Sequence, residues 1–217
     1  MIDFNELIDE HLEREKSEKK IGRYWPSEVG GCLRETWFKY KKPKKTPVES
    51  LRHFEVGNMV HDFIVEVLES EDNSDVELLK SELPCRLDRE NYVISGRVDD
   101  VVLVKSEGKT WLVEVKSTKN LNYCEEPKKD HEMQLMFYMH STGIRNGALL
   151  YLQKYDLEAK TFEVEYSEEK SQEVLERFDK LHESLTNDKI PEPEAKKNEE
   201  IKWKCRYCDY KEECEDE

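Results

Sequence analysis

The order of apolar patterns along the chain predicts an α/β protein in which helices flank a mixed central sheet. Helical spacing dominates the first 70 residues, and strand patterns cluster between residues 76 and 117. A helical segment then crosses to two further strand patterns between residues 148 and 166. At 217 residues, of which 36% are apolar, the chain is long enough for one substantial domain with a small appendage.

Three helical segments are expected before the strands. The first covers residues 3 to about 20, with an apolar stripe of Phe4, Leu7, Ile8 and Leu12. Ser27 can cap the second, which breaks at Pro43. The third is expected from Glu49 to Glu69. Its inward stripe consists of Leu51, Phe54, His61, Ile64 and Leu68.

The strands and the later helices follow from the same patterns. Strands are expected at Val76–Leu87, Tyr92–Lys105, Thr110–Ser117, Ala148–Tyr155 and Thr161–Tyr166. Pro127 fits the first turn of a helix that runs to about Ser141. Ser167 can cap a last long helix, whose inward residues include Phe178 and Leu181.

The domain boundary is expected at Pro191 and Pro193, which begin a polar linker. We expect residues 1–190 to form a single domain. Residues 191–217 are then a linker and a cysteine-bearing segment packed on that domain, rather than a second fold.

Composition limits the class of partner. The chain has 35 Lys+Arg against 50 Asp+Glu, a net charge of −15, so any contact with DNA requires a local basic patch. The run Lys39–Lys45 is the candidate, with Lys202, Lys204 and Arg206 of the cysteine segment beside it. No secretory signal and no membrane span is visible, so we expect a cytoplasmic protein. Six cysteines are then more consistent with metal ligands or buried thiols than with disulfides.

The central feature of the sequence is the stretch from Gly96 to Lys116, which predicts two strands joined by a turn near Gly108. A turn centred between residues 107 and 108 pairs Asp99 with Lys116 and puts Glu114 on the same face. Asp100 would point the other way. Two carboxylates and a lysine on one face of an apolar hairpin are costly to bury without a purpose, so the hairpin is a candidate metal site.

Three other residues are candidates for chemistry. His61 is either a buried histidine bonded to a backbone carbonyl or a metal ligand, and an imidazole would favour Mn²⁺ over Mg²⁺. Gln134 and Tyr138 lie one turn apart and share a helix face, together with His131. They could position a phosphate, although the edge of an amphipathic helix would give the same pattern.

The spacing of the cysteines is a sharper signal. Cys205, Cys208 and Cys214 lie within ten residues, and Cys32, beside a glycine pair, is the natural fourth ligand. A zinc site completed by Cys32 or by a histidine has the same pattern. Cys85 and Cys124 have no partner pattern.

Taken together, these motifs resemble the RecB-type PD-(D/E)XK nucleases that carry a cysteine-held iron–sulfur cluster. The resemblance is strongest to the RecB-like CRISPR-associated exonucleases, the fourth family in that naming series, and covers the chain from about Pro26 to Cys214. The motif G-x-x-x-H is similar to Gly57–His61, G-x-x-D to Gly96–Asp99, E-x-K to Glu114 and Lys116, and Q-x-x-x-Y to Gln134 and Tyr138. The family's cysteines, one early and three late, match Cys32, Cys205, Cys208 and Cys214.

The resemblance implies a restriction-endonuclease-like fold and a metal-dependent DNA nuclease, often a 5′ to 3′ exonuclease on single strands with variable endonuclease activity. It implies a [4Fe–4S] cluster held by the four cysteines. In CRISPR systems such proteins trim spacer precursors alongside the integration complex, and stand-alone relatives occur in viruses, plasmids and repair systems.

The resemblance also implies roles for the site residues. Asp99, Glu114, His61 and the main-chain carbonyl of Val115 would hold one or two Mn²⁺ or Mg²⁺ ions. Lys116 would orient a water or stabilise the phosphate oxygens, and Gln134 and Tyr138 would position the strand. The alternative is a non-catalytic DNA-binding or scaffold protein with a zinc-held tail. Intact Asp99, Glu114 and Lys116 favour the nuclease.

Overall fold

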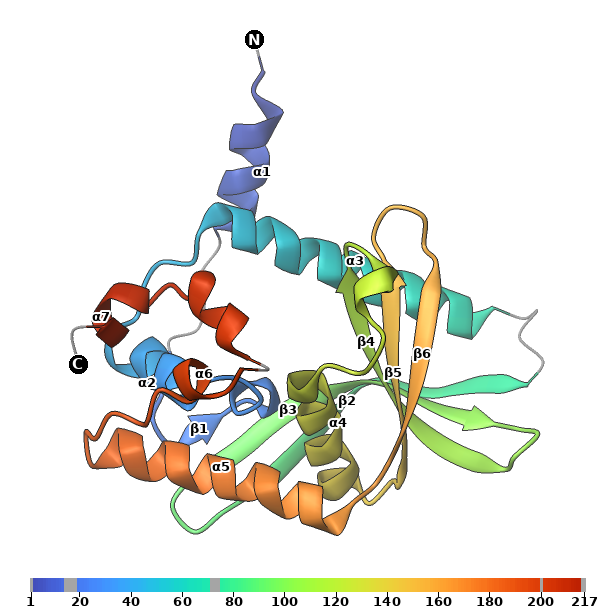
Figure 1. Cartoon of the computed structure of the whole chain (residues 1–217). Helices are drawn as coiled ribbons and strands as arrows, with labels where there is room; N and C mark the ends of the chain where they lie inside the picture. Colours follow the sequence, from blue (N-terminus) through green and yellow to red (C-terminus); the bar gives the residue numbers. More distant parts are fainter. Residues whose placement is uncertain (1, 14–18, 71–74, 200, 216–217) are drawn as a thin grey trace.

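The fold is built on a single six-stranded sheet, seen in a computed structural model that describes residues 2–13, 19–70, 75–199 and 201–215 (Figure 1). Its strands are β1 (Arg23–Tyr24), β2 (Val76–Asp88), β3 (Val93–Val104), β4 (Lys109–Thr118), β5 (Asn146–Gln153) and β6 (Ala159–Glu165). Their order is β1-β3-β4-β5-β6, with β2 also paired to β3. The β4–β5 pair is parallel and β3–β4 and β5–β6 are antiparallel, so the predicted mixed sheet is confirmed.

Helices cover both faces of this sheet. On one face lies α3 (Val48–Glu69), whose Val60 and Ile64 pack against Val115 and Leu152. On the other face lie α4 (Lys129–Thr142), which links the parallel strands β4 and β5, and α5 (Glu168–Thr186). Figure 1 shows α3 and α5 on opposite sides of the molecule with α4 between them. Alternate side chains of β4 therefore point toward α3 on one face of the sheet and toward α4 and α5 on the other.

The register of the β3–β4 hairpin differs from the predicted one by two residues. Val104 pairs with Lys109 and Asp100 with Val113, so residues 105–108 form the turn and Asp99 is level with Glu114, not Lys116. Gly108 takes φ +64° in this turn, as its position predicted. Because the shift is even, Asp99, Glu114 and Lys116 keep their common face.

The helices before the strands differ more from expectation. Helix α1 (Phe4–Leu12) ends before the predicted limit near residue 20; residues 14–18 of the predicted helix lie outside the described residues. Instead of a helix from Ser27, a 3₁₀ turn η1 (Pro26–Glu28) precedes α2 (Leu33–Lys41), and Cys32 occupies the N-cap position of α2. Phe54, predicted to face inward, is 59% exposed. The buried residues of α3 are Leu51, Val60 and Ile64, so Phe54 lies outside the buried stripe of this helix.

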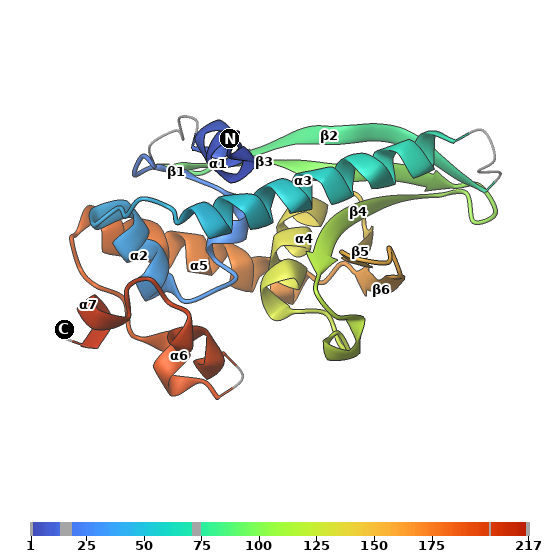
Figure 2. The same ribbon diagram turned by 90° about the horizontal axis from the view of Figure 1, so that it is seen from above.

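The cysteine-bearing segment folds against α2. It contains α6 (Glu194–Lys197), the 3₁₀ helix η3 (Lys202–Arg206) and α7 (Lys211–Glu215). Tyr210 is 2% exposed and stacks on Phe38 of α2 at 5.5 Å between ring centroids. In the second view, α6 and α7 lie beside α2, at the end of the molecule away from the β3–β4 turn (Figure 2). None of the helices in the described ranges is long and apolar enough to cross a membrane.

Candidate functional site

Four of the predicted site residues form one hydrogen-bonded group between β4 and α4. Lys116 Nζ lies 2.6 Å from Glu114 Oε1 and 3.2 Å from Gln134 Oε1. Gln134 Nε2 donates to Glu114 Oε1 at 2.7 Å and to the Tyr138 hydroxyl at 3.2 Å. The two contacts that reach Glu114 both fall on its Oε1 oxygen. The other, Oε2, is buried and has no partner among the described residues.

Burial controls the charges of this group. It raises the pKa of Glu114, which is 1% exposed, to about 7 in spite of the nearby Lys116 ammonium. Burial also raises the pKa of Asp99, whose Oδ2 accepts a hydrogen bond from the Val115 amide at 2.8 Å. Burial alone would lower the pKa of Lys116, but the carboxylates of Glu114 and Asp99 outweigh it and raise that pKa. The lysine therefore stays charged beside two carboxyls that resist ionisation.

His61 does not join the same set of contacts but lies beside Asp100. Its Nε2 is 3.4 Å from Asp100 Oδ2, and this carboxylate raises the pKa of His61 to about 9. Asp100 is fully buried, and both of its oxygens and His61 Nε2 lack a hydrogen-bond partner among the described residues. Sequence reasoning set Asp100 aside because it points away from Glu114. The signal in the sequence that could have identified Asp100 is the presence of a second acid beside Asp99 in a strand that is otherwise apolar, between Val98 and Val101.

Steric crowding explains why the G-x-x-D motif has a glycine, Gly96, at its first position. A Cβ at Gly96 would lie 2.8 Å from the ring of Pro26 and 3.3 Å from the Tyr138 hydroxyl. A side chain at Gly96 would therefore push η1 and α4 away from β3. Gly57, by contrast, has room for a Cβ at ordinary contact distance from Ser117.

The residues around the hairpin suit a divalent cation by the chemistry of their donors. Within the described ranges, the atoms around the hairpin that lack a hydrogen bond include Glu114 Oε2, His61 Nε2 and the two oxygens of Asp100, with the Asp99 carboxyl beside them. Oxygen donors with one imidazole nitrogen fit Mn²⁺ and Mg²⁺. No three described His, Cys, Asp or Glu side chains stand close enough together to hold an ion as placed, so a cation would have to draw them together.

The four predicted cysteine ligands line a single pocket of about 50 Å³ formed by α2 and the C-terminal segment. Burial raises the pKa of Cys208 to about 11 and also raises that of Cys205. Four thiols on one cavity are the donor set of a tetrathiolate metal centre, although no three of them stand close enough together to hold an ion as placed. Cys85 and Cys124, which have no partner pattern in the sequence, are buried in the main core.

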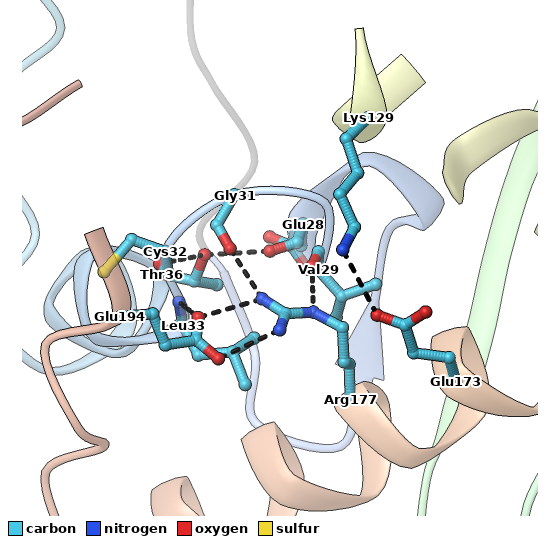
Figure 3. Close-up of polar contacts among 10 residues, drawn as sticks. All are labelled: Glu28, Val29, Gly31, Cys32, Leu33, Thr36, Lys129, Glu173, Arg177 and Glu194. Carbon is cyan, nitrogen blue, oxygen red and sulfur yellow. Dashed lines mark hydrogen bonds and ion pairs between the residues drawn. The ribbon is translucent and has the colours of Figure 1, made fainter. Parts of the chain in front are cut away.

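Arg177 of α5 holds the loop that carries Cys32 (Figure 3). It donates to the carbonyls of Val29 and Gly31 at 2.6 Å and forms a two-point ion pair with Glu194. Glu194 in turn accepts from the amide of Leu33 at 3.0 Å. The residues on both sides of Cys32 are thus fixed by one arginine–glutamate pair.

We expect Arg177→Met to lower the free energy of unfolding by about 2–3 kcal/mol, because it leaves two carbonyls and a half-buried carboxylate without their donor. Chemical denaturation followed by circular dichroism measures this. The control is Arg86→Met, since Arg86 makes an exposed ion pair with Asp88 and its loss should leave the midpoint unchanged. Equal midpoints for wild type and Arg177→Met would show that the pair does not hold the loop.

The lysine run predicted as a basic patch is compensated by acids. Its ion pairs include Lys39–Glu35, Lys41–Asp188, Lys44–Glu213 and Lys45–Glu13, and those of the C-terminal segment include Lys202–Glu199 and Lys204–Asp130. The run therefore offers less positive potential to a nucleic acid than its composition indicated.

A mixed sheet flanked by helices, with Asp, Glu-x-Lys and Gln on adjoining elements, is the arrangement of a nuclease of the restriction-endonuclease type. The chain belongs to the PD-(D/E)XK nuclease superfamily, whose sequence profile matches residues 4–215. A comparison with curated proteins finds no match.

Solved structures with a similar fold include the following two. The crystal structure of SSO0001 has a TM-score of 0.66 at 17% identity, covering 96% of this chain and 94% of that one. LHK-Exo of Laribacter hongkongensis, an alkaline exonuclease solved in complex with dAMP, has a TM-score of 0.50 at 14% identity. That match covers 77% of this chain and 90% of LHK-Exo.

Proposed function

We propose that this protein is a metal-dependent DNA nuclease that acts as a 5′ to 3′ exonuclease on single strands, with additional endonuclease activity. The observation that carries the proposal is the Glu114 carboxylate: one oxygen is fixed by Lys116 and Gln134, and the other is buried with no partner in the described part of the chain. LHK-Exo supports the substrate class, since it is an exonuclease solved with a nucleotide.

Each side chain has a distinct task in this proposal. Asp99, Glu114, His61 and the Val115 carbonyl would hold Mn²⁺ or Mg²⁺, and the buried Asp100, 3.4 Å from His61 Nε2, would orient the imidazole. When bound, the ion neutralises charge at the scissile phosphate and makes a water more acidic. Lys116 keeps its proton and can donate to a phosphate oxygen. Gln134 fixes the orientation of both Glu114 and Lys116, and Tyr138 borders the same group.

The four cysteines would hold a [4Fe–4S] cluster that ties Cys32 to the C-terminal segment. The shared pocket and the fixed Cys32 loop support this proposal. Such a cross-link closes a long loop, where a constraint on the unfolded chain can stabilise most. The proposed setting is CRISPR spacer acquisition, together with the spacer-integration complex, or DNA repair; the sequence motifs alone support it.

The test is cleavage of end-labelled single- and double-stranded DNA with Mn²⁺ or Mg²⁺, using either a 5′ or a 3′ label. The proposal expects stepwise products from the 5′ end of single strands and none with a chelator. Binding of DNA without cleavage under all of these conditions would favour the scaffold alternative.

The pKa values predict that metal affinity rises with pH. Glu114, with a pKa of about 7, and His61, with a pKa of about 9, must each lose a proton before binding a cation. Between pH 7 and 9 Glu114 has lost its proton and His61 still carries one, so affinity should rise about tenfold per pH unit. Below pH 7 the rise is steeper, because both groups release protons.

Isothermal titration with Mn²⁺ at several pH values, in buffers of different ionisation enthalpy, measures both the affinity and the number of protons released. His61→Ala is the matched control and should lose the slope between pH 7 and 9. If that slope persists in His61→Ala, the proton comes from another group and His61 is not a ligand.

A further inference from the structure

His131 lies at the edge of the candidate active site but is not part of the hydrogen-bonded group described above. It is on α4, one turn before Gln134, and shares a helix face with Gln134 and Tyr138. The imidazole is partly exposed and lies in the electrostatic field of both Lys116 and Lys204. A ligand could therefore reach it from the side where α4 meets the C-terminal segment.

The hydrogen bonds of Tyr151 determine which nitrogen of His131 carries the proton. The Tyr151 oxygen accepts from the Lys128 amide at 3.1 Å and lies 2.8 Å from His131 Nδ1. Tyr151 is 1% exposed, so its own hydroxyl proton needs an acceptor within the protein. His131 Nδ1 is that acceptor, which places the imidazole proton on Nε2.

The imidazole also remains neutral in this setting. Burial, followed by the positive charge of Lys116, lowers the pKa of His131 to about 3. His131 therefore presents a neutral N–H donor at neutral pH. The adjacent acid Asp130, which is paired with Lys204 at 2.8 Å, acts to raise the pKa of His131 but does not outweigh burial and Lys116.

We propose that His131 is a further substrate-contacting residue, which donates from Nε2–H to a non-bridging phosphate oxygen of the nucleic-acid strand. Tyr151 is its positioning residue, because it fixes the tautomer. A neutral donor within the electrostatic influence of Lys116, Lys128 and Lys204 suits an anionic oxygen, and a phosphate at this point would lie one helical turn from Gln134. This inference rests on the proposed nuclease function and extends its strand-binding surface.

The experiment compares His131→Phe, which removes the donor, with His131→Gln, which keeps an N–H near the Nε2 position. We expect His131→Phe to raise the KM for a single-stranded oligonucleotide about tenfold with kcat nearly unchanged, and His131→Gln to restore most of the loss. His140→Gln is the matched control, because His140 lies on the same helix as His131 and its Nδ1 likewise contacts a tyrosine hydroxyl, that of Tyr166. It should leave KM unchanged.

Two measurements keep this inference separate from the nuclease proposal. Nitrogen-15 NMR of the imidazoles should show His131 neutral with its proton on Nε2, and Tyr151→Phe should mix the tautomers. Fluorescence anisotropy should show weaker binding of the oligonucleotide to metal-free His131→Phe. If wild type cleaves nothing, the nuclease proposal fails while both of these measurements stand. Unchanged KM and binding in His131→Phe, or a proton on Nδ1 in wild type, would overturn the inference.

Discussion

Glu114→Ala is expected to abolish cleavage, with a loss of about a thousandfold or more in kcat. The carboxylate is the proposed metal ligand, and one of its oxygens is buried with no partner among the described residues. A correctly held cation lowers the activation free energy of cleavage by several kcal/mol, and each 1.36 kcal/mol corresponds to about a factor of ten in rate. Single-turnover cleavage of a labelled oligonucleotide in Mn²⁺ measures the loss. Because alanine also leaves the Lys116 ammonium without its acid, Glu114→Gln is needed as a second variant of the same shape.

The matched control is Glu107→Ala, which removes an acid from the turn of the same hairpin and should cleave at the wild-type rate. Lys116→Ala should lose activity but bind Mn²⁺ better than Glu114→Ala does, since an ammonium is not a ligand. Cleavage by both Glu114 variants at the wild-type rate would mean that the active site lies elsewhere.

Cys208→Ser is expected to give a protein without a bound iron–sulfur cluster and with a much lower free energy of unfolding. Metal binding contributes directly to folding when ligands come from distant parts of the chain, as Cys32 and Cys208 do. Iron, sulfide and zinc analysis of the purified protein measures the loss of the centre, and thermal unfolding measures its effect on the fold.

Cys85→Ser and Cys124→Ser are the controls, because both thiols lie in the main core and not in the cysteine pocket. They should keep full iron content even where a buried hydroxyl costs some stability. If the wild-type protein contains zinc and no iron, the four cysteines hold a tetrathiolate zinc site and not an iron–sulfur cluster. Loss of metal from either control would overturn the choice of ligands.

The sheet and its flanking helices could be predicted from the sequence because their patterns are long and regular. The parity of the β3–β4 hairpin was predicted correctly, but its register was not, since the turn has four residues and only Gly108 marks it. The start of α2 at Leu33 was also missed. There the Glu28 carboxylate accepts a hydrogen bond from the Trp25 amide and stabilises a 3₁₀ turn in place of an α-helix. A periodic pattern of apolar residues does not show this side-chain hydrogen bond.

Within the candidate site, sequence spacing placed Gln134 and Lys116 together but could not show their shared contact with Glu114 Oε1. It could not find the approach of Asp100 to His61, because that depends on how α3 crosses the sheet. The role of Arg177 was likewise invisible, since its partners Val29 and Glu194 are 148 and 17 residues away in the sequence.

The hydrogen bond from Val115 to Asp99 makes one backbone amide a spectroscopic reporter of the candidate site. Paired residues of β3 and β4 end at Asp100 and Val113, and beyond them the Val115 N–H binds a side-chain carboxyl in place of a strand carbonyl. The chemical shift and hydrogen exchange of this amide therefore depend on the ionisation of Asp99 rather than on sheet geometry alone. A single resonance in the centre of the fold would thus follow proton loss and cation capture at the hairpin, without a substrate and without a substitution.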